Sequence, residues 1–120
     1  MQIPSFHDGG FDGFRIGPDK QVQLYLTTVK RESFVLTLEG VEVMTLTDIK
    51  EGNIILNLVI RRDRELTISD IEQLYGMPNN PTVAGNLLKA AADKGFQLLE
   101  INPSYGAEGM ILFRTWKLQP

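Results

Sequence analysis

The residue types that could do chemistry gather near the start of the chain, in the stretch HDGGFDG at residues 7–13. It holds the single histidine of the sequence, His7, and two carboxylates, Asp8 and Asp12, with glycines between them. One imidazole and two carboxylates form a chemically sensible ligand set for a divalent metal ion, and the glycines would let the loop curl around it. The sequence therefore offers His7, Asp8 and Asp12 as candidate metal ligands.

The same stretch is also typical of tight turns. Glycine tolerates a positive φ, and aspartate side chains accept hydrogen bonds from nearby backbone amides. Turn chemistry explains every residue here except His7, whose partly buried ring could donate to a backbone carbonyl. The calcium-loop pattern of alternating acidic residues that ends in a glutamate is absent from the sequence. We favour the turn interpretation and expect no bound cofactor.

The motifs of common catalytic sites are missing. The sequence has no G-x-x-x-x-G-K-[ST] phosphate loop, no H-E-x-x-H zinc motif and no G-x-S-x-G serine motif. Because it has no cysteine, disulfides, zinc–thiolate sites and cysteine nucleophiles are excluded. A serine triad would have to combine Ser5 with His7, and nothing in the sequence supplies its oxyanion hole. We therefore expect a protein that is not an enzyme.

Two further polar, glycine-bearing segments bear on the site, EGN at residues 51–53 and SYGAEG at residues 104–109. If the strand order brought both to the HDGG segment, the three would form an acidic pocket with one aromatic wall. The candidate binding residues of such a pocket are His7, Asp8, Glu51, Asn53, Tyr105 and Glu108. Because turn residues are expected wherever antiparallel strands reverse, we favour the alternative that the segments lie at opposite ends of the sheet.

The composition is that of an ordinary globular domain spanning residues 1–120, with 42% hydrophobic and 22% charged residues. The net charge of −3 argues against a nucleic-acid partner, because phosphates attract a clustered positive surface. Arg61, Arg62 and Arg64 form the one basic cluster, which we expect to be a solvated strand end. Neither a signal sequence nor an apolar stretch of membrane-spanning length is found, so we expect a cytoplasmic protein without a membrane partner.

Alternating apolar residues predict a series of antiparallel strands in the first half of the chain. They are expected at residues 11–16, 21–27, 33–38, 41–46 and 53–60. The last strand, NIILNLVI, is the most apolar, and the four apolar residues at its even positions 54 to 60 are predicted to form one buried face. Since its other face is also partly apolar, it should be central in the sheet or be covered there by a helix or a partner chain.

Helical signals follow the fifth strand. Ser69 and Glu72 match a capping box for a short helix, and Asn80 followed by Pro81 marks the start of a longer one. The buried face of the longer helix is predicted to consist of Val83, Leu87, Leu88 and Ala91. Two more strands are expected at residues 96–101 and 110–118, and in the second of these Phe113 and Trp116 should point to opposite faces.

Together these elements predict an α+β fold. It should be a mainly antiparallel β-meander sheet, with a short and a longer helix inserted before a C-terminal β-hairpin. Both helices are expected to pack on one face of the sheet.

Four short motifs are similar, in kind and order, to those of a family of small uncharacterised bacterial proteins. They are FHDG at residues 6–9, LEGV at 38–41, EGNII at 51–55 and PSYGA at 103–107. Some members of that family are described as candidate immunity proteins of polymorphic toxin systems. The resemblance implies a binding role, because an immunity protein occludes its toxin with a complementary surface, often acidic against a basic cleft. It implies no catalytic residues.

Two hypotheses for the function follow. The first is a non-enzymatic cytosolic protein–protein interaction module, such as an immunity-type inhibitor or a small oligomeric accessory protein that forms a homodimer. The strand at residues 53–60, which needs cover on both faces, favours it. The second is a small-ligand or divalent-metal-binding domain, an enzyme included, that uses the loop residues around His7.

Overall fold

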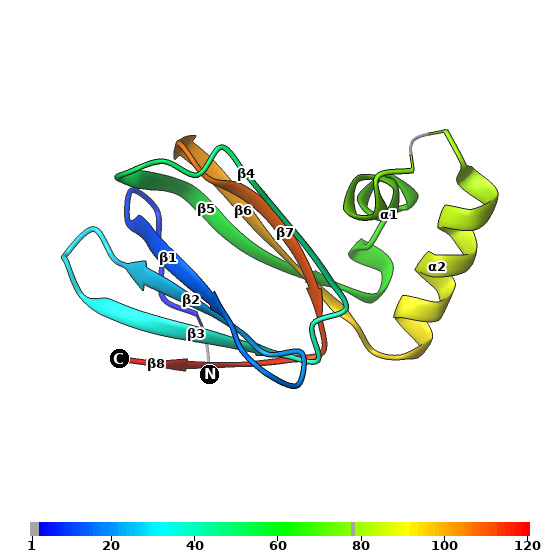
Figure 1. Cartoon of the computed structure of the whole chain (residues 1–120), viewed down its shortest axis with the longest axis horizontal. Helices are drawn as coiled ribbons and strands as arrows, with labels where there is room; N and C mark the ends of the chain where they lie inside the picture. Colours follow the sequence, from blue (N-terminus) through cyan, green and yellow to red (C-terminus); the bar gives the residue numbers. More distant parts are fainter. Residues whose placement is uncertain (1–2, 78) are drawn as a thin grey trace.

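A computed structural model describes residues 3–77 and 79–120, which form one antiparallel sheet of eight strands with two helices packed on it (Figure 1). The strands are β1 (Gly10–Ile16), β2 (Val22–Thr27), β3 (Ser33–Glu39), β4 (Val43–Thr47), β5 (Asn53–Arg62), β6 (Gln97–Tyr105), β7 (Glu108–Phe113) and β8 (Thr115–Gln119). A 3₁₀ turn, η1 (Asp63–Glu65), and helices α1 (Ile68–Tyr75) and α2 (Pro81–Asp93) connect β5 to β6. The predicted α+β class is confirmed.

The strand order β4-β7-β6-β5-β1-β2-β3-β8 folds over into two layers, β4-β7-β6-β5 and β1-β2-β3-β8 (Figure 1). Consecutive strands pair in β1-β2-β3 and β5-β6-β7, whereas β4 pairs with β7. The chain passes from β3 to β4 and from β7 to β8 through adjacent bends, where Arg114 N donates to Glu39 O at 3.0 Å and Glu42 N to Leu112 O at 2.8 Å. The β4–β7 and β3–β8 ladders are therefore two halves of one bent two-stranded ribbon, and this ribbon joins the two layers.

Gly40 makes this bend possible. Its φ is +66°, and a Cβ there would lie 2.8 Å from Cγ of Arg114. The strand predicted at residues 110–118 is consequently two strands that meet at Arg114. Because the bend changes the alternation of side chains, Phe113 and Trp116 pack in the same core, and the prediction that they face opposite ways is wrong.

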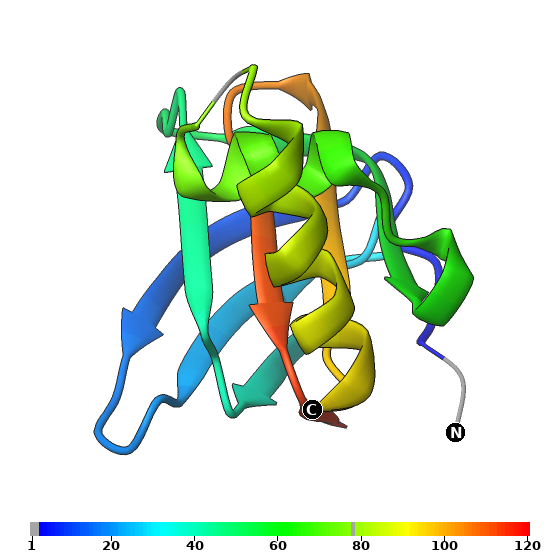
Figure 2. The same cartoon turned by 90° about the vertical axis from the view of Figure 1, so that its right-hand side faces the viewer.

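The apolar side chains form two clusters, one on each side of the β4-β7-β6-β5 layer. The larger fills the space between the layers, where Leu24, Leu36, Ile101 and Phe113 are completely buried. The smaller lies between the outer face of this layer and the helices, which Figure 2 shows in front of the sheet. Its buried members are Leu66, Leu74, Ala91, Phe96, Leu98 and Leu112. Burial of each large aliphatic side chain stabilises the fold by about 1.5–3 kcal/mol.

The prediction of one continuous apolar face on β5 is wrong. Ile54 and Leu56 are 42% and 44% exposed, whereas Ile55 is buried. Leu56 is an extra residue that the partner strand β6 does not match, so the alternation of side chains reverses there. Leu58 and Ile60 then return to the core between the layers.

The start of α2 follows the prediction, but its buried face is shifted. Asn80 caps the helix by accepting from Val83 N at 3.4 Å, and Pro81 is its first residue. Ala84 and Ala91 are the buried residues, whereas Val83 is 42% exposed, which corrects its predicted place in the core. Within the described parts of the chain, neither helix is long and apolar enough to cross a membrane.

The cap of α1 also differs from the predicted Ser69–Glu72 pair. Thr67 N donates to Asp70 Oδ2 at 2.8 Å, and Asp70 N donates to Thr67 Oγ1 at 3.2 Å. The capping box thus begins two residues earlier, which leaves the Asp70 carboxylate at the inner side of the helix start, where the residue is only 8% exposed.

Arg61 of β5 connects this helical layer to the sheet by hydrogen bonds and ion pairs. Its Nη2 and Nη1 donate to the two carboxylate oxygens of Asp70 at 2.7 and 2.9 Å. Nη2 also donates to Glu100 Oε1 on β6 at 2.8 Å, and Nη1 to the Glu65 carbonyl at 2.6 Å. The three charged side chains are 11–24% exposed, so they form a largely desolvated network that connects β5, β6, η1 and α1.

The network also fixes the charges of its members. Burial acts to raise the pKa of Asp70, but hydrogen bonds from Arg61 and Thr67 outweigh it and hold that pKa below its usual value. The hydrogen bond to Asp70 raises the pKa of Arg61 in spite of its burial. The expectation of a solvated cluster is therefore wrong for Arg61, whereas Arg62 and Arg64 are exposed.

We predict that Arg61→Met lowers the free energy of unfolding by about 3 kcal/mol, because it leaves desolvated carboxylates of Asp70 and Glu100 without their cation. Urea denaturation followed by tryptophan fluorescence measures the loss. The matched control is Arg62→Met, one residue along and exposed, for which a change within about 0.5 kcal/mol is expected. Equal effects of the two substitutions would contradict this role of Arg61.

Stability should also depend on the titration of Asp70. Its folded pKa lies below the unfolded value, so its contribution is present above the unfolded pKa and disappears as the pH falls through the folded one. We predict that the unfolding free energy declines from about pH 5 to about pH 2, and less steeply in Asp70→Asn than in the exposed control Asp93→Asn. Urea curves over a pH series measure both slopes, and slopes that do not differ would refute the assignment.

Candidate functional site

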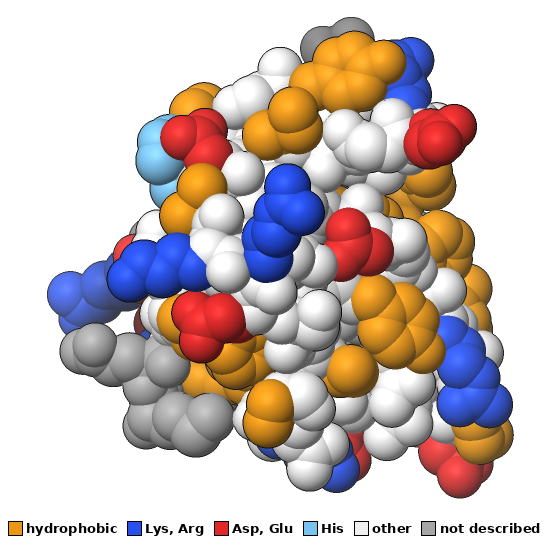
Figure 3. Space-filling model, turned by 90° about the vertical axis from the view of Figure 1, so that its left-hand side faces the viewer, with side chains coloured by type: hydrophobic (Ala, Val, Ile, Leu, Met, Phe, Trp, Pro, Cys, Tyr) orange, Lys and Arg blue, Asp and Glu red, His pale blue; other side chains and the backbone are white. Residues whose placement is uncertain are grey.

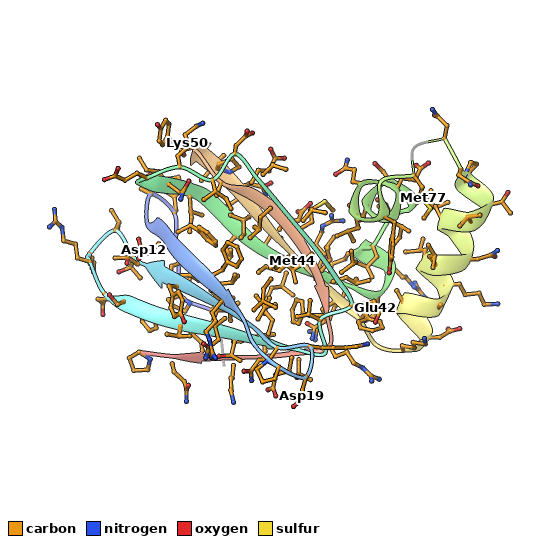
Figure 4. All side chains as sticks on the ribbon, in the orientation of Figure 1. Asp12, Asp19, Glu42, Met44, Lys50 and Met77 are labelled. Atoms are coloured by element: carbon orange, nitrogen blue, oxygen red, sulfur yellow. The ribbon has the colours of Figure 1, made fainter. Side chains whose placement is uncertain are left out.

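The three glycine-bearing segments meet at one end of the two-layered sheet, opposite the helices. Figure 4 places Lys50 and Asp12 at this end, and Asp19 and Glu42 at the other. The HDGG segment runs beside β5, where Asp8 N donates to Ile55 O and Ile55 N donates to Gly9 O, both at 2.9 Å. The expectation that the segments lie at opposite ends of the sheet is therefore wrong.

Asn53 is the residue that joins the three segments. Its Nδ2 donates to the carbonyls of Phe11 at 3.2 Å and Lys50 at 2.6 Å. Its Oδ1 accepts from Lys50 N at 2.8 Å and from Ala107 N at 2.9 Å. These four bonds use the full donor and acceptor capacity of the amide, which is only 7% exposed. Asn53, a predicted binding residue, is thus a structural crosslink.

The glycines of the HDGG segment serve close packing. A Cβ at Gly9 would lie 2.1 Å from the Thr27 carbonyl oxygen, so only glycine lets this segment approach β2. Gly9 N donates to Phe6 O at 2.8 Å, and Asp8 takes a φ of +61° in the turn between them. The structure therefore supports the turn interpretation of HDGG.

His7 lies across the bulge of β5. Its Nδ1 is 2.7 Å from the Leu56 carbonyl oxygen, so this nitrogen carries the proton and donates, as the sequence suggested. Nε2 is 3.4 Å from Asp8 Oδ2, and Figure 3 shows the pale-blue histidine beside an acidic side chain. The His7 side chain is 59% exposed, however, which corrects the expectation of partial burial.

The structure does not gather His7, Asp8 and Asp12 into a metal site. The Asp12 carboxylate instead accepts a hydrogen bond from the Thr27 hydroxyl on β2. Over residues 3–77 and 79–120, no group of three histidine or acidic side chains is arranged to hold a metal ion. The hypothesis of a divalent-metal site around His7 therefore has no geometric support.

Large apolar side chains remain uncovered beside these loops. Ile54 on β5 lies directly opposite Tyr105 on β6, and Tyr105 is 51% exposed. Cross-strand partners share a face of the sheet, and the helices cover that face only at its far end (Figure 1). We call this area the loop-end surface and define it by the exposed residues His7, Asp8, Glu51, Ile54, Leu56, Tyr105 and Glu108.

Ile54 and Leu56 were missed as surface residues because their alternation predicts a buried face. The signal that could have revealed them is Pro103 on the paired strand, which pairs with Ile55 between two register shifts. Proline cannot donate to a ladder, and inside a sheet it is typical of edges and bulges. The sequence could therefore have predicted that a bulge lies opposite Pro103. It could not have predicted that this bulge exposes Leu56.

Negative charge is concentrated in the same segments. The three segments contain five carboxylates and one lysine, which gives them a net charge of −4; their residues are 7–12, 48–53 and 104–109. The net charge of the whole chain is −3. The five are the exposed Asp8, Asp12, Asp48, Glu51 and Glu108. Figure 3, which faces this end, also shows basic side chains across its centre and left side. The apolar residues of the loop-end surface therefore lie among the acidic groups of these segments, with basic side chains also present at this end.

Comparison of the chain with protein-family models, with curated proteins and with solved structures finds no match.

We predict that Asn53→Ala lowers the unfolding free energy by about 3 kcal/mol, since it leaves several buried backbone groups without a partner. Urea denaturation measures this loss, and hydrogen exchange of the Ala107 amide should accelerate more than exchange in the core of β2. The control is Asn57→Ala on the same strand, which loses one exposed hydrogen bond to Asn102. A stability change as small as that of the control would contradict the crosslink.

Proposed function

We propose that this protein is a non-enzymatic protein–protein interaction module that binds a basic protein partner through the loop-end surface. The observation that carries the proposal is the trio Ile54, Leu56 and Tyr105, which are 42–51% exposed next to one another and flanked by carboxylates. An apolar centre with a polar rim is the usual anatomy of a specific interface, and tyrosine is among its most frequent anchors.

The rigidity of the surface supports this role. Asn53 holds all three loops by hydrogen bonds of 2.6–3.2 Å, and the bulge at Leu56 is bridged by the ring of His7. A surface that is ordered before binding loses little conformational entropy when a partner docks, so more of the contact energy remains as affinity.

The acidic rim indicates the charge of the partner. A two-fold homodimer through this surface would bring two copies of the same acidic segments together, and like charges opposed across an interface are unfavourable. A basic partner would instead be attracted by the net charge of −4 in the three segments. The nucleic-acid cleft of a nuclease toxin has that chemistry, so the resemblance to candidate immunity proteins agrees with this proposal.

The test uses the products of the genes adjacent to this one, and first a toxin with a basic, nuclease-like C-terminal domain. Calorimetry should show binding that Leu56→Ser and Tyr105→Ala each weaken by about 10- to 100-fold, the range for central anchor residues. Glu51→Lys and Glu108→Lys should slow association and reduce its dependence on salt.

The controls lie at the other end of the sheet. Ile16→Ser removes an apolar side chain that is 66% exposed, and Asp19→Lys reverses an exposed charge, so both should leave the affinity unchanged. Three results would refute the proposal: no binding by any adjacent gene product, equal losses in the control variants, or sedimentation of the free protein as a dimer that Leu56→Ser dissociates.

A further inference from the structure

A second feature lies at the helix end of the molecule, away from the loop-end surface. A cleft of about 450 Å³ opens between the β3–β4 bend and the end of α2, near the labelled Glu42 in Figure 4. Its lining residues are Lys20, Gly40, Glu42, Lys94, Phe96 and Arg114. They come from the β1–β2 turn, the two adjacent bends and the end of α2, so the cleft exists only in the folded chain.

Two contacts orient the exposed side chain of Arg114 in the wall of this cleft. Its guanidinium lies over the ring of Phe96, 5.6 Å from the ring centroid, and Nη2 donates to the Lys94 carbonyl at 3.1 Å. Gly40 packs against the aliphatic part of the side chain. A guanidinium has five N–H donors arranged for planar oxyanions, and one that is already positioned loses less entropy on binding.

The cleft is positively charged in an acidic protein. Lys20, Lys94 and Arg114 face one carboxylate, that of Glu42, which lies 3.7 Å from the Lys20 Nζ. Attraction to the carbonyl end of α2 explains why Lys94 and Arg114 lie there. Lys20, on the β1–β2 turn, is positioned by its ion pair with Glu42, so the three cations exceed the single carboxylate by two charges.

A smaller cavity with both apolar and polar lining adjoins the cleft. This cavity, of about 60 Å³, shares Glu42, Lys94 and Phe96 with the cleft and is also lined by Tyr75 and Leu112. The hydroxyl of Tyr75 is protonated at neutral pH and can donate a hydrogen bond, and burial and the negative charge of Glu42 raise its pKa further. A ligand that fills both spaces would thus combine an anionic head with a small apolar group.

We propose that this cleft binds the phosphate or carboxylate group of a small organic anion, with Lys20, Lys94 and Arg114 around the oxyanion and the apolar part directed toward Tyr75. This is a small-molecule binding activity, separate from the proposed protein interface. The two sites share no residue, so either can fail without the other.

The test is an NMR titration of the ¹⁵N-labelled full chain with phenyl phosphate, benzoate, inorganic phosphate and neutral benzyl alcohol. The backbone amides of Gly40 and Gly95 report on the two walls. We expect saturable shifts with phenyl phosphate or benzoate, weaker binding of inorganic phosphate and no saturation with benzyl alcohol. The stronger of the two organic anions identifies the preferred head group. Absence of saturation by both, or equal binding of benzyl alcohol, overturns the proposal.

Charge variants separate binding from a structural effect. Lys94→Gln should weaken phenyl phosphate or benzoate about threefold to tenfold, and Glu42→Gln should strengthen it by a similar factor, because one nearby charge is removed in each. The matched control is Lys89→Gln, an exposed lysine of α2 outside this cleft, for which no change is expected. Unchanged or weaker binding in Glu42→Gln, or equal losses in the two lysine variants, overturns the assignment.

Discussion

The junction between the two layers of the sheet depends on one buried amide, the side chain of Asn53. β1 and β5, the strands where the two layers of the sheet meet, share only the pairs Gly10–Ile54 and Phe11–Asn53. So short a ladder supplies few hydrogen bonds to the junction on this side, opposite the bent ribbon that also joins the layers. The Asn53 side chain adds hydrogen bonds to three separate segments at this point and thereby fixes the junction. The loops that carry the proposed contact surface are ordered by the same bonds.

Both ends of the molecule carry charged groups beside apolar ones. Acidic groups surround exposed apolar residues where the three loops meet, and three cations line the cleft near the end of α2. Between them, Arg61 pairs with Asp70 and Glu100 in a largely desolvated network. Its function is to hold α1 against the sheet, because the helical layer would otherwise be attached mainly by nonpolar contacts.

Local patterns predicted local structure well, and failures arose where one residue changes the alternation of a strand. The strands, the Asn80–Pro81 helix start and the α+β class follow from periodicity and capping chemistry, which act over a few residues. Leu56 and Arg114 each reverse the side-chain alternation, and their effect depends on a partner strand far along the chain. A single sequence does not reveal such partners.

The candidate site was predictable in part for the same reason. Turn chemistry identified the HDGG, EGN and SYGAEG segments, and most of their polar residues are exposed there. Their convergence on Asn53 follows from the order β6-β5-β1, which is a long-range property. The cleft residues Lys20, Glu42, Lys94 and Arg114 carry no motif, because four distant segments supply them.

The bulge at Leu56 makes the exposed apolar residues of β5 depend on the strand register that also sets which residues are buried. On β5, odd-numbered residues face the core before the bulge and even-numbered residues face it afterwards, as Ile55 and Leu58 illustrate. A slip of one position would bury Ile54 and expose its core neighbour Ile55, so the apolar surface patch would vanish together with correct packing. A partner of the proposed kind that contacts Ile54 and Leu56 together would therefore bind the native chain and not misregistered forms.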